Sequence, residues 1–84
     1  MDNKILVIVY IPMIEKEYDV MIPVFRKIGT IKSLIIKTIK EDGNGEFLSP
    51  STTYLYDKKS GNKLDDNIFV KHSVIVNGSK LILY

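Results

Sequence analysis

The sequence of 84 residues contains no cysteine, a single histidine and no long apolar run. Without cysteine the chain can form neither a disulfide nor a thiolate metal site, so its stability must come from packing. The apolar run Ile5 to Ile11 stops at Pro12 and is too short for a membrane span or a signal peptide. We therefore expect a single domain, residues 1–84, located in the cytoplasm and without direct membrane insertion.

Nucleic-acid and nucleotide binding are disfavoured as well. Twelve basic and ten acidic residues give a net charge of +2, and the lysines are scattered along the chain instead of being clustered. Gly43 and Gly45 follow the expected helix, at the end where the helix dipole repels phosphate. We expect no nucleic-acid partner and no nucleotide cofactor.

The residues that could carry chemistry are few. His72 has no cysteine or serine elbow motif to act with, so we expect a surface residue, no catalytic site and no enzyme. Oxygen ligands alternate over Asp42 to Glu46 as in calcium loops, but Phe47 and Thr53 stand where glycine and glutamate are needed. Asp65-Asp66 are best explained as turn caps, so we expect no metal and no cofactor.

One segment, Thr30 to Gly43, has a sustained helical period. Its apolar stripe is formed by residues spaced i, i+3, i+4, i+7 and i+8, namely Ile31, Leu34, Ile35, Thr38 and Ile39. Lys32 is on the opposite, solvent-facing side of this pattern. Thr30 suits the N-cap and Gly43 the left-handed residue beyond the end. This stripe must be buried against strands.

Strands account for most of the remaining chain. Lys4 to Ile11 is apolar at nearly every position, which indicates a central strand; we place Leu6, Ile8 and Tyr10 toward the helix. Lys16 to Ile22 alternates, with Tyr18, Val20 and Ile22 on one face, and pairs with the first strand as a hairpin. Val24 to Gly29 connects it to the helix, with Phe25 and Ile28 tucked under the helix start.

The pattern in the second half of the sequence predicts shorter strands. Thr52 to Tyr56 is a third strand and Lys63-Leu64 a short fourth one. Asp65 to Val76 shows no convincing helical or strand period. Three apolar residues should anchor this connection, namely Ile68, Val70 and Ile75. Asn77-Gly78 is a tight turn before the last strand, Ser79 to Tyr84. The order of hairpin, helix, two short strands and a final strand, with right-handed crossover, predicts an α+β fold of the β-grasp type. One helix would pack on a mixed sheet of four to five strands.

The sequence resembles ubiquitin-like proteins in its spacing. The core series Leu64, Val70, Ile75, Leu81 and Leu83 has intervals of 6, 5, 6 and 2 residues, similar to the second half of the ubiquitin fold. Within that superfamily the chain resembles the bacterial YukD and EsaB type associated with type VII (ESX-type) secretion. The matching segments are Tyr18-Asp19-Val20 before Ile22-Pro23, Ile31 to Ile35, and Ile75 to Leu81.

The resemblance implies a non-enzymatic accessory or regulatory component of the secretion machinery that acts through protein contacts. A ubiquitin-like modifier or sulfur carrier needs a flexible tail ending in Gly-Gly, whereas this sequence ends in Leu81-Ile82-Leu83-Tyr84. We therefore do not expect conjugation if Tyr84 is the native terminus. The alternative is a modifier or sulfur carrier whose tail lies beyond these residues.

Alternation within the strands predicts an apolar outer face. If Leu55 is in the core, its neighbours face outward, and the same holds for the residues flanking Leu83. Tyrosine and isoleucine on an exposed sheet suit a protein interface. The predicted interface residues are Tyr54, Tyr56, Ile82, Tyr84, Val7 and Val9. This face would bind a type VII secretion component, and it could equally pair two copies as a homodimer.

Overall fold

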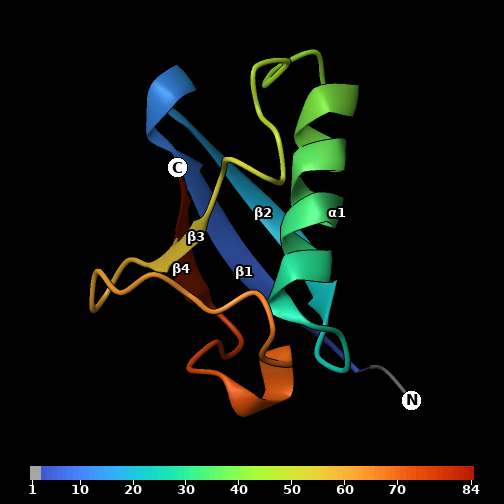
Figure 1. Cartoon of the computed structure of the whole chain (residues 1–84), viewed down its shortest axis with the longest axis vertical. Coiled ribbons are helices and arrows are strands. Elements are labelled where there is room, and N and C mark those ends of the chain that lie inside the picture. The colour runs from blue at the N-terminus through green and yellow to red at the C-terminus, as the bar shows by residue number, and fades with distance from the viewer. Residues whose placement is uncertain (1–2) are drawn as a thin grey trace.

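The computed structural model describes residues 3–84, which form one helix packed against one face of a four-stranded sheet (Figure 1). The elements are β1 (Lys4–Ile11), β2 (Lys16–Pro23), α1 (Ile28–Glu41), β3 (Leu55–Asp57) and β4 (Ser79–Leu83). The sheet order is β2-β1-β4-β3, with β1 and β4 parallel and the other pairs antiparallel. The α+β prediction of a helix on a mixed sheet is confirmed. The predicted strand at Lys63-Leu64 is reduced to an isolated bridge between Lys63 and Tyr56.

The hairpin of β1 and β2 closes through the single-turn 3-10 helix η1 (Pro12–Ile14). Glu15 adopts a positive φ of 51°, and its backbone N–H donates to the carbonyl oxygen of Pro12 at 3.2 Å. In the register that results, Val9 lies opposite Tyr18 and Val7 opposite Val20. Residues opposite each other in an antiparallel pair share a face.

The predicted orientation of β1 is wrong. Val7, Val9 and Ile11 are fully buried, whereas Ile8 and Tyr10 are half-buried on the other face. The cause is the hairpin register: Tyr18 and Val20 face the helix, so their partners on β1 must do the same. β1 therefore places its β-branched row in the core.

The helix starts at Ile28, two residues before the predicted Thr30 cap, and its N-cap residue Lys27 makes no side-chain capping bond. The first N–H groups bond instead to a distant segment: Ile28 donates to the carbonyl oxygen of Ile68 at 2.8 Å, and Gly29 to that of Asp66 at 3.0 Å. These backbone carbonyl groups, which come from a segment distant in the sequence, replace a side-chain cap. Beyond the C-terminal end, Gly43 has a φ of 79°, as predicted.

The buried face of α1 is rotated relative to the predicted stripe. Its buried residues are Ile28, Ile31, Lys32, Ile35, Ile36 and Ile39. Leu34 is 46% exposed and Thr38 is also exposed, so both were wrongly assigned to the core. Ile28, Lys32 and Ile36 follow one another at spacings of four residues and form a second buried row beside Ile31, Ile35 and Ile39.

Lys32 is the one charged residue in this buried face, contrary to the prediction that it points to solvent. Its ammonium Nζ lies 2.9 Å from Oδ2 of Asp66, and its side chain is only 4% exposed. The pair joins α1 to the segment that follows Lys63-Leu64. The backbone approaches closely here, since a Cβ added at Gly29 would lie 3.1 Å from the Cβ of Asp66.

The connection from Asp65 to Val76 is anchored as predicted, through buried Val70 and Ile75. Val70 opens the 3-10 helix η2 (Val70–His72), and its N–H donates to the carbonyl oxygen of Arg26 at 2.9 Å. Ile68 and Phe25 lie at the surface, so the prediction that these two side chains are packed inside is wrong. No helix within residues 3–84 is long and apolar enough to cross a membrane.

Candidate protein interface on the outer face of the sheet

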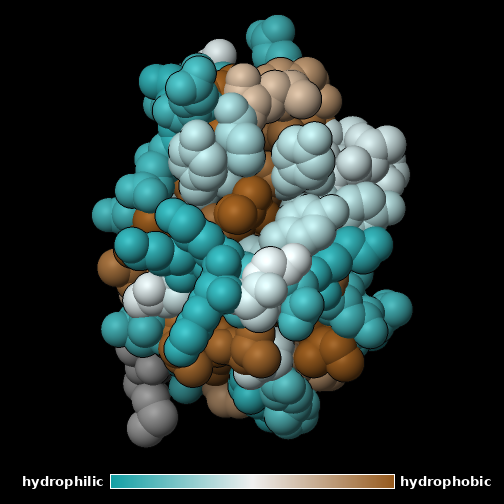
Figure 2. Space-filling view, turned by 90° about the vertical axis from the view of Figure 1, so that its left-hand side faces the viewer, coloured by the Kyte–Doolittle hydropathy of each residue, from teal (hydrophilic) through white to brown (hydrophobic). Residues whose placement is uncertain are grey.

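The face of the sheet turned away from α1 carries a row of three large side chains. Ile82 of β4 lies opposite Tyr56 of β3 on one side and opposite Tyr10 of β1 on the other. All three side chains are half-buried. We call Tyr10, Ile82 and Tyr56 the outer row. Figure 2, which views the molecule from the side opposite the helix, shows apolar side chains surrounded by residues of intermediate hydropathy.

Polar residues on β2 and β4 lie next to the outer row on the same face of the sheet. Ile8 lies between Lys80 on β4 and Asp19 on β2, and Tyr10 lies opposite Glu17. Lys80, Asp19 and Glu17 are exposed. An apolar centre with a charged rim is the usual organisation of a protein interface. Because the centre stands on paired strands, little conformational entropy would be lost on binding.

The structure brings together only part of the predicted interface. Tyr56 and Ile82 are neighbours on the outer face as predicted. Val7 and Val9 are completely buried beneath α1, so neither can contact a partner and their assignment was wrong. Tyr10 takes their place, and the prediction missed it. The length of the hairpin turn could have identified it, because a four-residue connection from Pro12 to Glu15 already puts Val9 opposite Tyr18.

Tyr84 is exposed but lies outside the outer row, directly after β4 and two residues beyond Ile82. It is 67% exposed and borders a hollow of about 270 Å³ together with Met13 and Phe47. Its backbone pairs with Tyr54, the N–H of each donating to the carbonyl oxygen of the other at 2.9 and 3.1 Å. Tyr84 therefore extends the apolar surface toward the turn of the first hairpin.

Tyr54 belongs to a different cluster at the β3 edge of the sheet. The ammonium groups of Lys63 and Lys32 lie 4.1 Å and 5.0 Å from the centre of its ring. Both distances are within the range of cation–π attraction. Because Lys32 comes from the buried face of α1, Tyr54 is held beside the Lys32–Asp66 pair and not within the outer row.

The other candidates have structural roles. His72 is exposed, as predicted, and its ring meets that of Phe69 edge to face at 6.3 Å. Asp42 accepts hydrogen bonds through Oδ2 from the Tyr18 hydroxyl at 3.2 Å and from Asn44 Nδ2 at 3.1 Å, which ties this loop to β2. Among residues 3–84, no three histidine, cysteine or acidic side chains gather in a way that could hold a metal ion.

The two adjacent aspartates point in different directions, and the capping prediction is right for Asp65 and wrong for Asp66. Asp65 Oδ1 accepts a hydrogen bond from the backbone N–H of Asn67 at 2.9 Å, which confirms its capping role. Asp66 turns inward to Lys32. Its second oxygen, Oδ1, is buried and has no hydrogen-bond partner in the described part of the chain.

The element order, the central parallel pair and the single helix define a ubiquitin-like β-grasp fold. The chain matches no protein-family profile and no curated protein. Its fold is similar to the ubiquitin-like domain of an Arabidopsis thaliana protein, with 21% identity, a TM-score of 0.76 and coverage of 99% of this chain and 78% of that one. It is also similar to the ubiquitin of Caldiarchaeum subterraneum, with 16% identity, a TM-score of 0.74 and coverage of 95% and 90%. At these identities the likeness establishes the fold alone.

Proposed function

We propose that this chain is a non-enzymatic accessory or regulatory protein of a bacterial type VII secretion system, acting in the cytoplasm through protein contacts. The observation that carries the binding role is the outer row, in which Tyr10, Ile82 and Tyr56 cross three adjacent strands. The assignment to type VII secretion is supported by the resemblance to YukD and EsaB proteins in the segments Tyr18 to Pro23, Ile31 to Ile35 and Ile75 to Leu81.

The residues of that resemblance serve mainly to build the fold. Asn77 Oδ1 accepts a hydrogen bond from the backbone N–H of Leu6 at 2.8 Å, and the Gly78 N–H donates to the carbonyl oxygen of Leu6 at 2.7 Å. Gly78 has a φ of 88°, which favours glycine. This turn fixes β4 alongside β1 and thereby puts Ile82 next to Tyr10. The residues that resemble YukD and EsaB proteins therefore hold the strands in place, whereas the proposed interface, the outer row, lies elsewhere on the sheet.

The outer row suits a protein partner for a physical reason. Tyrosine offers a large contact area with few rotatable bonds, and its hydroxyl can stay hydrated until the partner arrives. Ile82 stands between the two rings and would be desolvated at the centre of the contact. Residues near the centre of an interface usually contribute most of its binding free energy.

The test uses the purified soluble part of the FtsK-like ATPase of a type VII secretion system from the same organism, with calorimetry to measure the dissociation constant. Replacing Tyr56 and Ile82 together by serine should weaken binding by at least about 30-fold, because two central side chains are lost. The matched control is Met21→Ser, which changes an exposed residue on β2 of the same sheet face.

The outcomes separate the two parts of the proposal. No binding of the unchanged protein to any soluble secretion component would contradict the assignment to type VII secretion. Unchanged binding by a folded Tyr56→Ser/Ile82→Ser variant would contradict the site. If sedimentation shows a dimer that the same variant abolishes, the outer row pairs two copies of the chain instead.

A ubiquitin-like modifier or sulfur carrier remains the alternative function, because the ubiquitin of Caldiarchaeum subterraneum shares this fold. The gene sequence following the codon for Tyr84 tests it directly. A short polar tail ending in Gly-Gly would favour the alternative over an accessory role.

A further inference from the structure

A groove runs along a different part of the surface, between the turn after β3 and the connection that leads into β4. Its first section, of about 780 Å³, is lined by residues 57–59 and by Val74 and residues 76–80. Its second section, of about 500 Å³, continues between residues 60–65 and the segment around His72. Asp57 and Val74 line both sections, so the two sections adjoin, and we treat them together as the groove.

The apolar lining of the first section comes from Val74 and Val76. Their side chains are 64% and 63% exposed, while Ile75 between them is buried and anchors the connection. The backbone here is held by the chain's own side chains. The Ile75 N–H donates to Ser73 Oγ at 3.1 Å, and the Val76 N–H to Ser79 Oγ at 2.8 Å. The two valines are therefore presented at the surface by an ordered segment.

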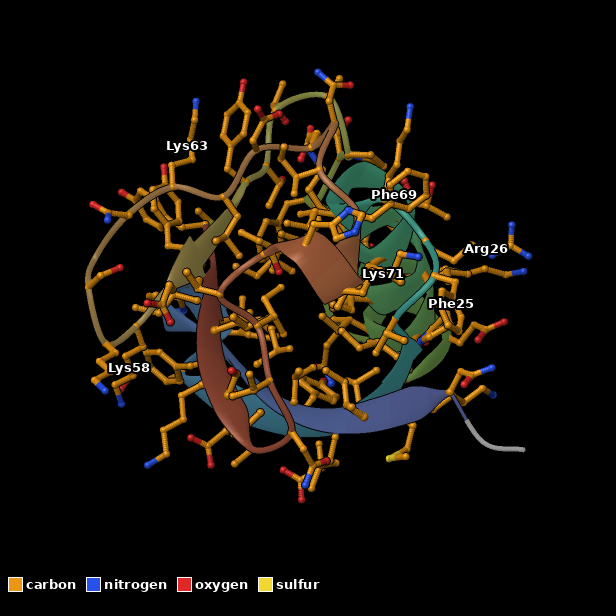
Figure 3. All side chains as sticks on the ribbon, turned by 90° about the horizontal axis from the view of Figure 1, so that it is seen from below. Phe25, Arg26, Lys58, Lys63, Phe69 and Lys71 are labelled. Atoms are coloured by element: carbon orange, nitrogen blue, oxygen red, sulfur yellow. The ribbon has the colours of Figure 1, made fainter. Side chains whose placement is uncertain are left out.

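The rim of the groove is strongly basic. Lys58, Lys59 and Lys80 line its first section and Lys63 its second. Lys58, Lys59 and Lys80 make no ion pair with any residue between 3 and 84. Figure 3 shows Lys58 and Lys63 along one side of the molecule, pointing outward and away from Phe69 and Lys71.

The acidic residues that line the groove are already engaged by the chain. Asp57 Oδ2 accepts hydrogen bonds from the backbone N–H and from the hydroxyl of Ser60, at 3.2 and 2.8 Å. Asp65 caps the turn at Asn67. These hydrogen bonds come from uncharged groups and leave both carboxylates negative, so four lysines against two aspartates give the groove a net charge of +2, which an acidic partner would complement.

We propose that this groove binds an extended acidic segment of a partner protein, with its carboxylates against the lysines and its aliphatic side chains against Val74 and Val76. In an extended peptide successive side chains point to opposite sides, so acidic and aliphatic residues can alternate between rim and floor. The combination of a hydrophobic floor with a basic rim favours such a peptide over a purely polyanionic ligand. This site adjoins the outer face of the sheet, since Lys80 borders both, and it does not depend on the type VII assignment.

The test measures amide chemical shifts of the whole chain during titration with a synthetic peptide in which Glu alternates with Val. A peptide of about eight residues extends over roughly 26 Å, comparable to the molecule itself. The molecule measures 31 × 28 × 22 Å along its principal axes. We expect the largest shift changes at residues 57–65 and 73–80, and binding that weakens as salt is raised.

Two variants probe the rim and the floor. Lys58→Glu/Lys59→Glu should weaken binding by at least about ten-fold, since attraction becomes repulsion. Its matched control, Lys37→Glu/Lys40→Glu, makes the same change in net charge at exposed positions on α1 and should bind as the unchanged protein does. Val74→Ser/Val76→Ser should weaken binding about ten-fold without altering the fold, because both side chains are exposed.

Several results would overturn the proposal. One is that a peptide with Lys in place of Glu binds as tightly as the acidic peptide. Another is an equal loss of binding in the α1 control variant, which would indicate a general charge effect. Shifts centred on Phe25 and Phe69, or on Tyr56 and Ile82, would place the peptide elsewhere. A single-stranded oligonucleotide of equal charge that binds more tightly would show that the groove prefers nucleic acid.

Discussion

The two faces of the sheet carry similar side chains but differ in what covers them. On the inner face Val9 and Leu81 are completely buried beneath α1, while on the outer face Ile8 and Ile82 are only half-buried. A sheet with one wet face normally alternates between apolar and polar residues, and β2 does so. β1 does not, although no second layer within residues 3–84 covers its outer face (Figure 1). The interface proposed above would account for this excess of apolar side chains on the central strand.

The sharpest comparison uses adjacent residues of β4. Leu81→Ala should reduce the free energy of unfolding by about 3 kcal/mol, because it leaves a cavity in a completely buried site. Ile82→Ala should reduce it by less than about 1 kcal/mol, since the side chain already touches solvent. Urea denaturation followed by circular dichroism gives both values. Equal losses at the two positions would mean that the outer face is as well packed as the core.

Charges on the two faces should differ as well. Asp66→Ala leaves the buried ammonium of Lys32 without its carboxylate and should cost about 2 kcal/mol, less than for a fully enclosed pair because Asp66 is partly exposed. Asp19→Ala on the outer face should change stability by no more than about 0.5 kcal/mol. The urea midpoints of the two variants test this contrast. Lys32→Met/Asp66→Ala should recover part of the loss if the unpaired charge is its cause.

The smallest effects are expected from introducing a hydroxyl on β1 by substitution with threonine. Val9→Thr buries a hydroxyl in the core and should cost about 1–2 kcal/mol. Ile8→Thr should cost less than about 1 kcal/mol, because the new hydroxyl can reach water and threonine is a good strand former. Thermal unfolding of the two variants measures the difference. A larger loss for Ile8→Thr than for Val9→Thr would contradict the observed orientation of β1.

Local patterns in the sequence were sufficient to predict the main elements. The alternation of Lys16 to Ile22 predicts β2 and its buried face, and the helical period predicts α1. Asn77-Gly78 marks the turn before β4, where Gly78 has a positive φ. Alternation from Leu55 and Leu83 also predicts that Tyr56 and Ile82 share the outer face. These features depend on residues close together in the chain.

The missed features depend on distant contacts. The helix start is set by carbonyl groups of Asp66 and Ile68, and Lys32 is buried because Asp66 lies 34 residues further on. The orientation of β1 cannot be read from its own pattern, since both of its faces are apolar, and requires the hairpin register with β2. Tyr54 departs from simple alternation because β3 begins only at Leu55. None of these contacts is apparent in the sequence pattern of a single element.

The parallel pairing of β1 with β4 also constrains how the chain can fold. The strand at the start of the described chain finds its central neighbour only at residues 79–83, and β3 pairs with that same late strand. Contacts between segments so far apart in sequence form slowly, because a large loop must close before they contribute stability. During synthesis the hairpin and α1 therefore leave the ribosome while the edge of β1 that pairs with β4 still lacks its partner. The native sheet can assemble only after Leu83 has emerged, so a nascent chain arrested before β4 should be open to proteases and chaperones.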